Sequence, residues 1–413
     1  MTEISVRPDS IGAPHLGTIA AFGIVIAALT FNLALSFVNA SVVHVGASTV
    51  IAVELLLIGA ATLMIFNRND SFLIVGIALS AWLIFEMAIR YQFDPKVFRD
   101  AFIPIIFYYL GRNYGTPAAA DRLVTIAILI VAAGALFEWA FLDTYLKYVD
   151  VMGYYVARGS LDASAATGEP GLFVSGLRFE GRTLLPILGE HRVSSVFLEP
   201  VSLGNFGAIA FAWTLLRDRA NPAALIAKTL GIAVILILGD ARFGVYLCGV
   251  VLLTYLIAPL ARPAMVFVLP FLVVVGLLWY AGAMVGAAWD NTTLGRFLLS
   301  GQLLSTLDLG QALGLKVTTV DFDDSGYSYM LSRFGLAGAA SLWALYVFGS
   351  PAETMESWRF KLFVCLYLIL LLSISTSSAT IKTGALLWFL AGSVAQGHRP
   401  APQTLQAPAA LNA

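Results

Sequence analysis

The stretch HRVSSVFLEPVSLGNFGAIAFAWTLLR, residues 191–217, contains the signal that decides the fold. Its second half is an apolar run, and Pro200 stands where that run begins. Proline is favoured at the first position of a helix, where its missing N–H costs nothing. A helix from Pro200 to about Leu216 is just long enough to cross the hydrocarbon core of a bilayer. We therefore expect a membrane-spanning helix with Glu199 at its N-cap.

Apolar runs of this kind recur along almost the whole chain. Of the 413 residues, 59% are hydrophobic and 12% are charged, and the mean hydropathy is +0.85. A soluble globular chain has about twice that share of charged residues. The net charge of −1 offers no basic face for a nucleic acid. The composition therefore predicts an all-α polytopic membrane protein.

The apolar ranges predict twelve membrane spans within one integral membrane domain, residues 1–397. The expected spans are 17–39, 46–66, 71–90, 98–111, 122–142, 196–217, 223–239, 243–261, 264–288, 326–349, 360–377 and 380–396. Two long connections, about 143–195 and about 289–325, are expected as outer loops. The Pro/Ala-rich tail, residues 398–413, is expected to be disordered.

The basic residues predict the orientation of the chain. An even number of spans puts both termini on one side, and segments on that side carry more lysine and arginine than the short loops opposite. This bias places the termini in the cytoplasm and the two long loops outside. Several arginines remain on the outer side against the rule, which indicates an anionic ligand there.

The outer entry to the helix that starts at Pro200 is the first candidate site. The free N–H groups after Pro200 and the helix dipole attract an anion, and Arg192 lies close enough in sequence to strengthen that attraction. Glu199 is expected to be ionised and to act as a base or to orient a sugar hydroxyl. A structural Arg–Glu pair is the alternative. Ionisable groups at membrane depth are costly and usually functional, which favours a site.

The turn LGDARFGVY, residues 238–246, is the second candidate. A tight turn explains Asp240, because aspartate forms local hydrogen bonds with the backbone there. A turn does not require Arg242, so a functional and a structural role both stay open for it.

The stretch DFDDSGYSYMLSRFGLAG, residues 321–338, is the third candidate. Asp324 and Ser325 stand where the helix that follows needs its N-cap. Tyr329 and Arg333 are four residues apart and share one helical face. Capping and structural packing are the alternatives to a ligand site.

The same stretch contains the D-x-D pattern of Asp321 and Asp323, with which nucleotide-sugar enzymes hold a metal diphosphate. The pattern is a weak signal, because no nucleotide-binding domain surrounds it. Capping is also the alternative for Asp323.

Further polar groups lie within or near the apolar runs. Glu54, Glu86 and Glu138 either pair with basic partners or line a hydrated groove. Tyr154 and Tyr155, in the first long loop, either stack on sugar rings or anchor the loop at the membrane interface.

Five motifs, in this order and spacing, resemble those of the O-antigen ligase and Wzy-type polysaccharide polymerase superfamily. They are RVSSVFLEP (192–200), ARFGV (241–245), LGRF (294–297), LGQALGL (309–315) and DSGYSYMLSRFGLAG (324–338). The resemblance covers roughly residues 192–338, whereas the first five spans contribute only their hydropathy and number.

The resemblance implies a membrane-embedded glycosyltransferase with GT-C-like architecture and an active site on the periplasmic face of the bacterial inner membrane. Donor and acceptor would be glycans on undecaprenyl pyrophosphate. A chain-length-regulating co-polymerase is an implied partner, and no metal or cofactor is implied.

The resemblance also implies roles for the motif residues. The expected pyrophosphate-binding residues are Arg192, Arg242, Arg296 and Arg333. The expected sugar-binding residues are Asp323, Ser325 and Tyr329. Glu199 or Asp324 would act as the catalytic base, and Glu199 is preferred because glutamate is a poor N-cap residue.

One departure from the superfamily separates two activities. Its ligases carry a histidine in the final loop, where this chain has residues 323–325 as Asp-Asp-Ser, and the four histidines of the chain lie elsewhere. This favours a polymerase, similar to those of exopolysaccharide systems, over a ligase. A lipid-linked glycan flippase or transporter is the non-enzyme alternative, but the sequence shows no convincing internal repeat of the kind expected for one.

Overall fold

The computed structural model describes most of the chain. The described residues are 16–66, 70–162, 164, 176–178, 184–290, 292–320, 322 and 324–395. The predicted disordered tail, residues 398–413, lies outside them, as do Asp321 and Asp323.

The described residues form helices and connections, with one isolated β-bridge between Leu177 and His191. The α-helices are α1 (Leu16–Ser41), α2 (Ala47–Ile65), α3 (Asp70–Arg90), α4 (Pro95–Tyr114), α5 (Pro117–Ala140), α6 (Leu142–Tyr148), α7 (Val151–Ala157), α8 (Pro200–Arg217), α9 (Pro222–Leu238), α10 (Arg242–Ile257), α11 (Pro263–Ala283), α12 (Thr293–Ser305), α13 (Leu309–Ala312), α14 (Gly326–Gly349), α15 (Met355–Leu372) and α16 (Ile381–Val394). Three short 3-10 helices are η4 (Pro186–Leu188), η5 (Ser195–Phe197) and η6 (Ser377–Ala379).

Proline marks the start of several helices, as the sequence predicts for α8. The helices with proline in the first turn are α4, α5, α8, α9 and α11. At this position the missing N–H breaks no helical hydrogen bond. Asp94, Thr116 and Asn221 cap three of these helices by accepting a backbone hydrogen bond.

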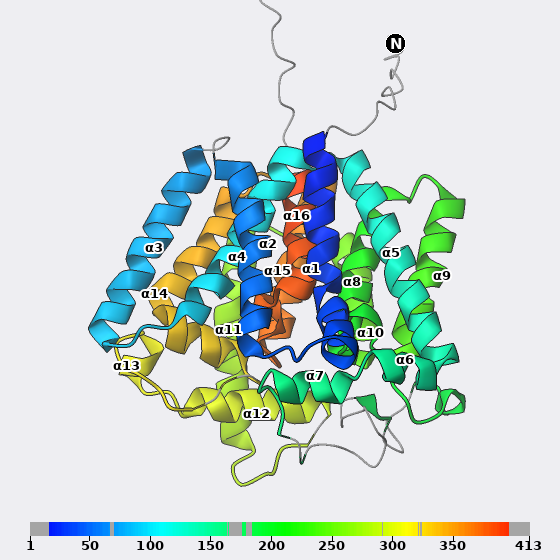
Figure 1. Ribbon diagram of the computed structural model, residues 1–413. Coiled ribbons are helices and arrows are strands. Elements are labelled where there is room, and N and C mark those ends of the chain that lie inside the picture. Colours follow the sequence, from blue (N-terminus) through cyan, green and yellow to red (C-terminus); the bar gives the residue numbers. More distant parts are fainter. Residues whose placement is uncertain are drawn as a thin grey trace, which may run out of the picture.

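Six of the described helices are long and apolar enough to cross a membrane. They are α1, α2, α3, α5, α11 and α14. Each range expected to span the membrane coincides with a helix to within about five residues. Figure 1 shows α1–α5, α8–α11 and α14–α16 running between two ends of the molecule, with the start of α1 and the end of α16 at the same end.

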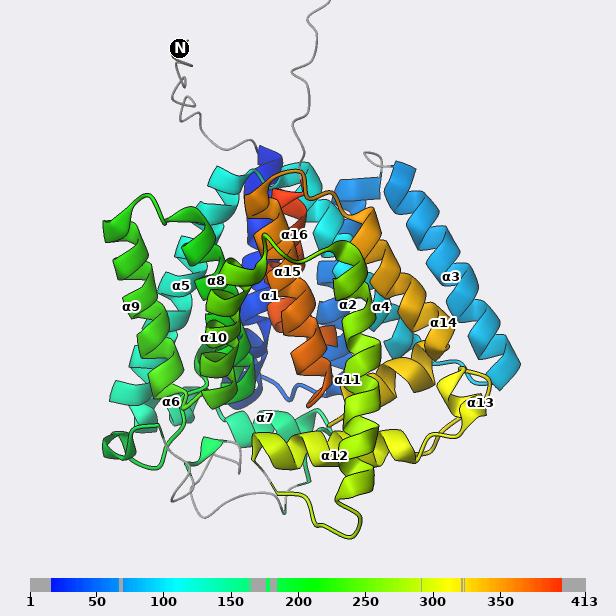
Figure 2. The same ribbon diagram turned by 180° about the vertical axis from the view of Figure 1, so that it is seen from behind.

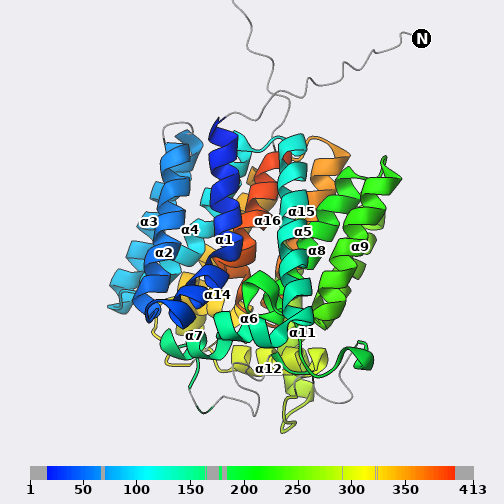
Figure 3. The same cartoon turned by 45° about the vertical axis from the view of Figure 1, so that its right-hand side comes forward.

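The two ranges expected as long outer loops contain helices. The first holds α6 and α7, and the second holds α12 and α13. In Figures 1, 2 and 3, α7 and α12 lie across the end of the molecule opposite to the start of α1 and the end of α16. We call this the lower end. Tyr154 and Tyr155 of α7 are buried, so α7 packs onto the bundle rather than extending away from it.

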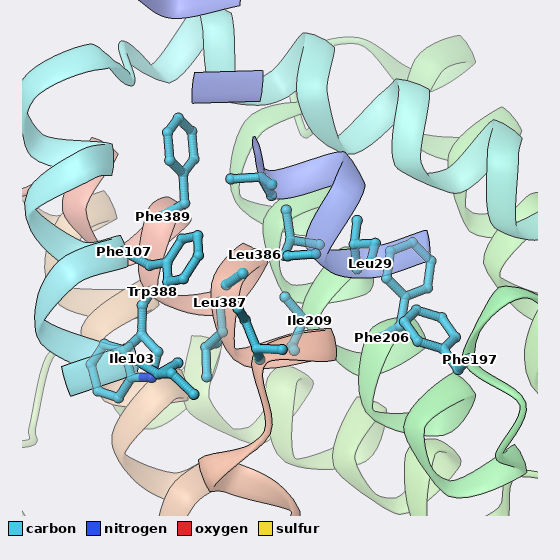
Figure 4. Packing of buried hydrophobic residues seen from close by; sticks show 14 of the residues in the cluster. Leu29, Ile103, Phe107, Phe197, Phe206, Ile209, Leu386, Leu387, Trp388 and Phe389 are labelled. Carbon is cyan, nitrogen blue, oxygen red and sulfur yellow. The ribbon is translucent and has the colours of Figure 1, made fainter. Parts of the chain in front are cut away.

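The short helix α16 lies at the centre of the core. Figure 4 shows its residues Leu386 to Phe389 between Phe107 of α4 on one side and Leu29 and Phe206 on the other. A Cβ atom at Gly392 would lie only 1.9 Å from the carbonyl oxygen of Tyr108 on α4. Glycine therefore allows the two backbones to touch, which is typical of helix pairs within membranes.

Candidate functional site

The segment before α8 is folded around a buried carboxylate. Glu138 of α5 is 1% exposed and accepts hydrogen bonds from the backbone N–H of Ser194 at 3.0 Å and that of Ser195 at 2.5 Å. The Nε2 atom of His191 lies 2.9 Å from the same carboxylate. A buried carboxylate is tolerated where donors surround it. Of the two alternatives for Glu138, the structure therefore shows a paired residue, and this pairing positions both Arg192 and Glu199.

Arg192 lies against the turn between α9 and α10. Its Nε atom donates to the carbonyl oxygen of Gly239 at 3.4 Å, and its Nη2 atom donates to that of Asp240 at 3.3 Å. The neighbouring Val193 N–H donates to Leu238 at 3.1 Å. The first and second candidate stretches therefore form one site.

Asp240 and Arg242 differ within that turn. Asp240 is buried, has a φ of 44°, and accepts a hydrogen bond from the N–H of Leu184 at 2.7 Å. These contacts fit the turn role predicted for it. Arg242 is the first residue of α10 and is half-buried, and no described residue forms a hydrogen bond or ion pair with its guanidinium.

Four arginines lie close together at this place, and we call Arg178, Arg192, Arg242 and Arg296 the arginine cluster. Burial lowers the pKa of the Arg192 guanidinium to about 10; the other three arginines act in the same direction, while Asp240 opposes them. Among the described acidic residues, Asp240 acts on Arg192 and Asp324 pairs with Arg296. The four positive charges of the cluster therefore outnumber the two negative charges of these carboxylates, and the excess positive charge attracts an anion.

The members of the arginine cluster are held in different ways. Arg178 is buried and donates to the carbonyl oxygens of Leu188, Gly189 and Leu238, so its guanidinium holds the loop together. Arg296 of α12 lies 3.4 Å from Asp324, and both side chains are partly exposed. Exposed pairs of this length are weak, so Arg296 can exchange this partner for a ligand.

Glu199 is the N-cap residue of α8 and Pro200 follows it in the first turn, which confirms the prediction from the sequence. Its carboxylate makes no capping hydrogen bond. It accepts instead from the hydroxyl groups of Tyr155 at 2.7 Å and Ser202 at 2.9 Å. Lys382 of α16 lies 3.0 Å from the same carboxylate.

These partners decide the charge of Glu199. Burial opposes ionisation, but the Lys382 ammonium and the hydroxyl groups of Tyr155 and Ser202 lower the pKa of the Glu199 carboxyl to about 2. Glu199 is therefore ionised at neutral pH, as expected. A carboxylate with so low a pKa is a weak base, but because it stays ionised it can still accept a hydrogen bond.

Lys382 was not singled out from the sequence. It is 6% exposed and lies at the second position of α16, with its Nζ atom 6.0 Å from the centre of the Tyr155 ring. The only signal in the sequence is a lone cation in an apolar range. The burial of Tyr155 and its hydrogen bond to Glu199 also show that it packs inside the protein and does not present its ring to a sugar.

The structure places the third candidate stretch in two different surroundings. Asp324 contacts the arginine cluster through Arg296, whereas Arg333 pairs with Asp94 at 3.3 Å. Tyr329 is buried and donates to Asp100 at 2.6 Å.

Ser325 caps α14, which confirms the prediction of its cap role. It is fully buried, and its hydroxyl group lies 2.8 Å from that of Ser300. The predicted sugar contact at Asp323 falls on a residue outside the described part of the chain.

Arg333 and Tyr329 are separated from the rest of α14 by a break. Gly335 has φ 61° and ψ 163°, which interrupts the helix. Two residues of α3 hold the carbonyl groups before the break: Arg90 donates to Ser332 at 2.7 Å, and Trp82 donates to Phe334 at 3.2 Å. The first part of α14 is therefore held by α3, and Arg333 is not among the groups that act on Arg192.

Comparisons of this chain with protein-family models, with curated proteins and with solved structures give no match. The site is therefore interpreted from its own residues and from the motif resemblance.

Proposed function

We propose that the chain is a glycosyltransferase of the inner membrane that joins oligosaccharide repeat units carried on undecaprenyl pyrophosphate. The arginine cluster is the observation that carries this proposal. Three of its members, Arg192, Arg242 and Arg296, come from three separate motifs and meet at the lower end of the bundle. The proposal includes twelve membrane spans, a GT-C-like architecture and a periplasmic lower end.

The chemistry of the cluster suits a pyrophosphate. Guanidinium groups bind phosphate oxygens in pairs through their planar N–H donors. Arg242 has donors that no described residue uses. The ion pair of Arg296 with Asp324 is 3.4 Å long and partly exposed, so a pyrophosphate can compete with Asp324 for the Arg296 guanidinium.

The proposed reaction transfers the growing glycan to a new repeat unit. A hydroxyl oxygen of the acceptor sugar bonds to the anomeric carbon of the donor, and the bond from that carbon to the pyrophosphate oxygen breaks. The lipid pyrophosphate leaves with the bonding electrons, and the arginine cluster stabilises the negative charge that develops on it. The hydroxyl proton leaves late in such a dissociative reaction, when the new bond has made the oxygen strongly acidic, and it passes to the Glu199 carboxylate.

Glu199 is the proposed acceptor for that hydroxyl group. Its low pKa makes it better at orienting the hydroxyl group than at removing a proton early. Lys382 and Tyr155 hold its carboxylate in place. Asp324 pairs with Arg296 of the cluster, and it acts in the proposal as the counter-ion that the pyrophosphate displaces.

Purified protein, reconstituted with radiolabelled lipid-linked repeat units, tests the proposal. We expect a ladder of products that remain on lipid pyrophosphate. A ligase would instead modify another acceptor, and a flippase would change only the sidedness of the label. Either result would contradict the polymerase proposal.

Single variants test the proposed site. Arg242→Ala and Arg296→Ala are expected to abolish the ladder, and Glu199→Gln is expected to reduce it strongly. Arg359→Ala is a matched control. The Arg359 guanidinium of α15 stacks on the Tyr255 ring, with 3.9 Å between the guanidinium carbon and the ring centre, and Arg359 is not part of the cluster. Full-length product from all three folded site variants would end the proposal.

A further inference from the structure

An apolar cavity lies beside the candidate site. It has a volume of about 430 Å³ and is lined mainly by α4, α11, α14 and α15, with single contributions from α3 and α16. Its walls are mainly aliphatic and aromatic, and they include Tyr108, Val274, Trp343, Tyr346 and Trp388. This volume is within the range of cavities that bind organic ligands.

Two prolines contribute to the cavity. Pro104 lies inside α4 and Pro270 lies inside α11, and both line the cavity. A proline in a helix interior removes one hydrogen bond and pushes away the preceding turn, which bends the helix. Prolines in two of its walls therefore favour bent helices around the cavity.

The cavity opens at the side of the bundle. Val275 of α11 and Leu336 and Leu345 of α14 line it, and each is also exposed at the surface. Figure 2 shows α11 and α14 next to each other on that side. Both helices are among those long and apolar enough to cross a membrane, so we expect this opening to face lipid chains.

Two residues of the cavity wall are close in sequence to the candidate site. Ala379 lines the cavity three residues before Lys382, the partner of Glu199. Tyr327 lines it three residues after Asp324, the partner of Arg296. A short length of chain therefore connects the cavity wall to each ion pair of the proposed active site.

We infer that this cavity binds the polyprenyl tail of the lipid-linked substrate, which enters between α11 and α14. The inference rests on the proposed function and adds the place of the tail. A polyprenyl pyrophosphate combines a long apolar chain with a multiply charged head group. The cavity matches the chain, and the excess positive charge of the arginine cluster matches the head group. A phospholipid has a similar chain but a head group with less negative charge.

Photo-crosslinking in nanodiscs tests the inference. The probe is a polyprenyl pyrophosphate with a diazirine on its tail, and adducts are mapped by mass spectrometry. We expect adducts at Tyr108 and Val274, and we expect unlabelled polyprenyl pyrophosphate to compete for them. A second arm uses phosphatidylglycerol with a diazirine on an acyl chain, which is expected to label only outward-facing residues such as Leu272.

Two variants on one helix provide the matched comparison. Ala340 lines the cavity, whereas Ala337 is exposed on the outside of α14. Ala340→Trp is expected to lower cavity labelling about tenfold, which corresponds to about 1.4 kcal/mol of binding, and Ala337→Trp is expected to leave it unchanged. Val274→Trp fills the cavity from α11 and replaces Ala340→Trp in the comparison if that variant does not fold. It is expected to lower cavity labelling in the same way.

The outcomes separate the two proposals. Equal labelling of both α14 variants, or stronger cavity labelling by phosphatidylglycerol than by the polyprenyl probe, would overturn the inference. Labelling requires no turnover, so it does not depend on catalysis. Correct labelling together with full activity of the arginine variants would overturn the proposed function and leave the tail site intact.

Discussion

The Nζ atom of Lys382 lies 3.0 Å from the Oε1 atom of Glu199, and the two residues come from α16 and the N-cap of α8. Tyr155 of α7 adds a hydrogen bond of 2.7 Å to the same oxygen. Three distant parts of the chain therefore meet at one carboxylate. This contact joins α8 and α16 of the bundle to α7 at its lower end.

The Lys382–Glu199 pair is expected to stabilise the fold. Lys382→Met leaves the Glu199 carboxylate without its cation, so we expect the free energy of unfolding to fall by about 2 kcal/mol. The loss is smaller than for a fully buried pair, because water reaches part of Glu199. Thermal unfolding of the purified protein measures the loss. The double variant Lys382→Met/Glu199→Gln removes both charges and is expected to recover part of it. A double variant no more stable than Lys382→Met would contradict the importance of the pair.

The lowered pKa of Glu199 predicts a dependence of stability on pH. Its pKa falls from the ordinary 4.5 to about 2 on folding. A group with a depressed folded pKa contributes stability that is present above pH 4.5 and is lost as the pH falls toward 2. Between pH 5 and pH 3 the melting temperature of the wild type is therefore expected to fall more steeply than that of Glu199→Gln. Parallel plots of melting temperature against pH for the two proteins would contradict the lowered pKa of Glu199.

Arg242 and Arg178 are expected to separate function from stability. Arg242→Ala removes a guanidinium that no described residue binds. The free energy of unfolding of this variant is therefore expected to differ from that of the wild type by about 0.5 kcal/mol or less. Its polymerising activity is expected to fall about 100-fold or more. Arg178→Ala removes hydrogen bonds to three carbonyl groups, of which Leu238 keeps the Val193 N–H as a donor, and is expected to cost about 2 kcal/mol. Melting temperature and product ladder, measured on both variants, check this contrast.

The break in α14 requires glycine at position 335. Its φ of 61° and ψ of 163° are accessible almost only to glycine, and an added Cβ would lie 2.4 Å from the Glu86 carboxylate. Gly335→Ala is expected to cost about 2 kcal/mol or more. Gly276→Ala in α11 is the control, because a Cβ there meets nothing within 4 Å. The control is expected to melt no lower than wild type.

Local signals in the sequence account for most of the fold. Apolar ranges of sufficient length predict helices near every position where the structure has a long one, because hydropathy and length act within a single segment. Pro200 and Ser325 mark the starts of α8 and α14 through local backbone geometry. The helices α7 and α12 were missed inside the expected loops, because they are short and their stability comes from packing onto the bundle.

The sequence by itself determined that the chain is a bundle of apolar helices, and its motifs indicated Arg192, Arg242, Arg296 and Glu199 as one site. Only the tertiary structure decided which charges meet. In the folded protein Lys382 pairs with Glu199, and Arg333 pairs with Asp94. The Glu138 carboxylate accepts a hydrogen bond from Ser194, two residues after Arg192. Ion pairs and buried hydrogen bonds depend on distances between side chains from separate helices, and these distances exist only once the helices have packed.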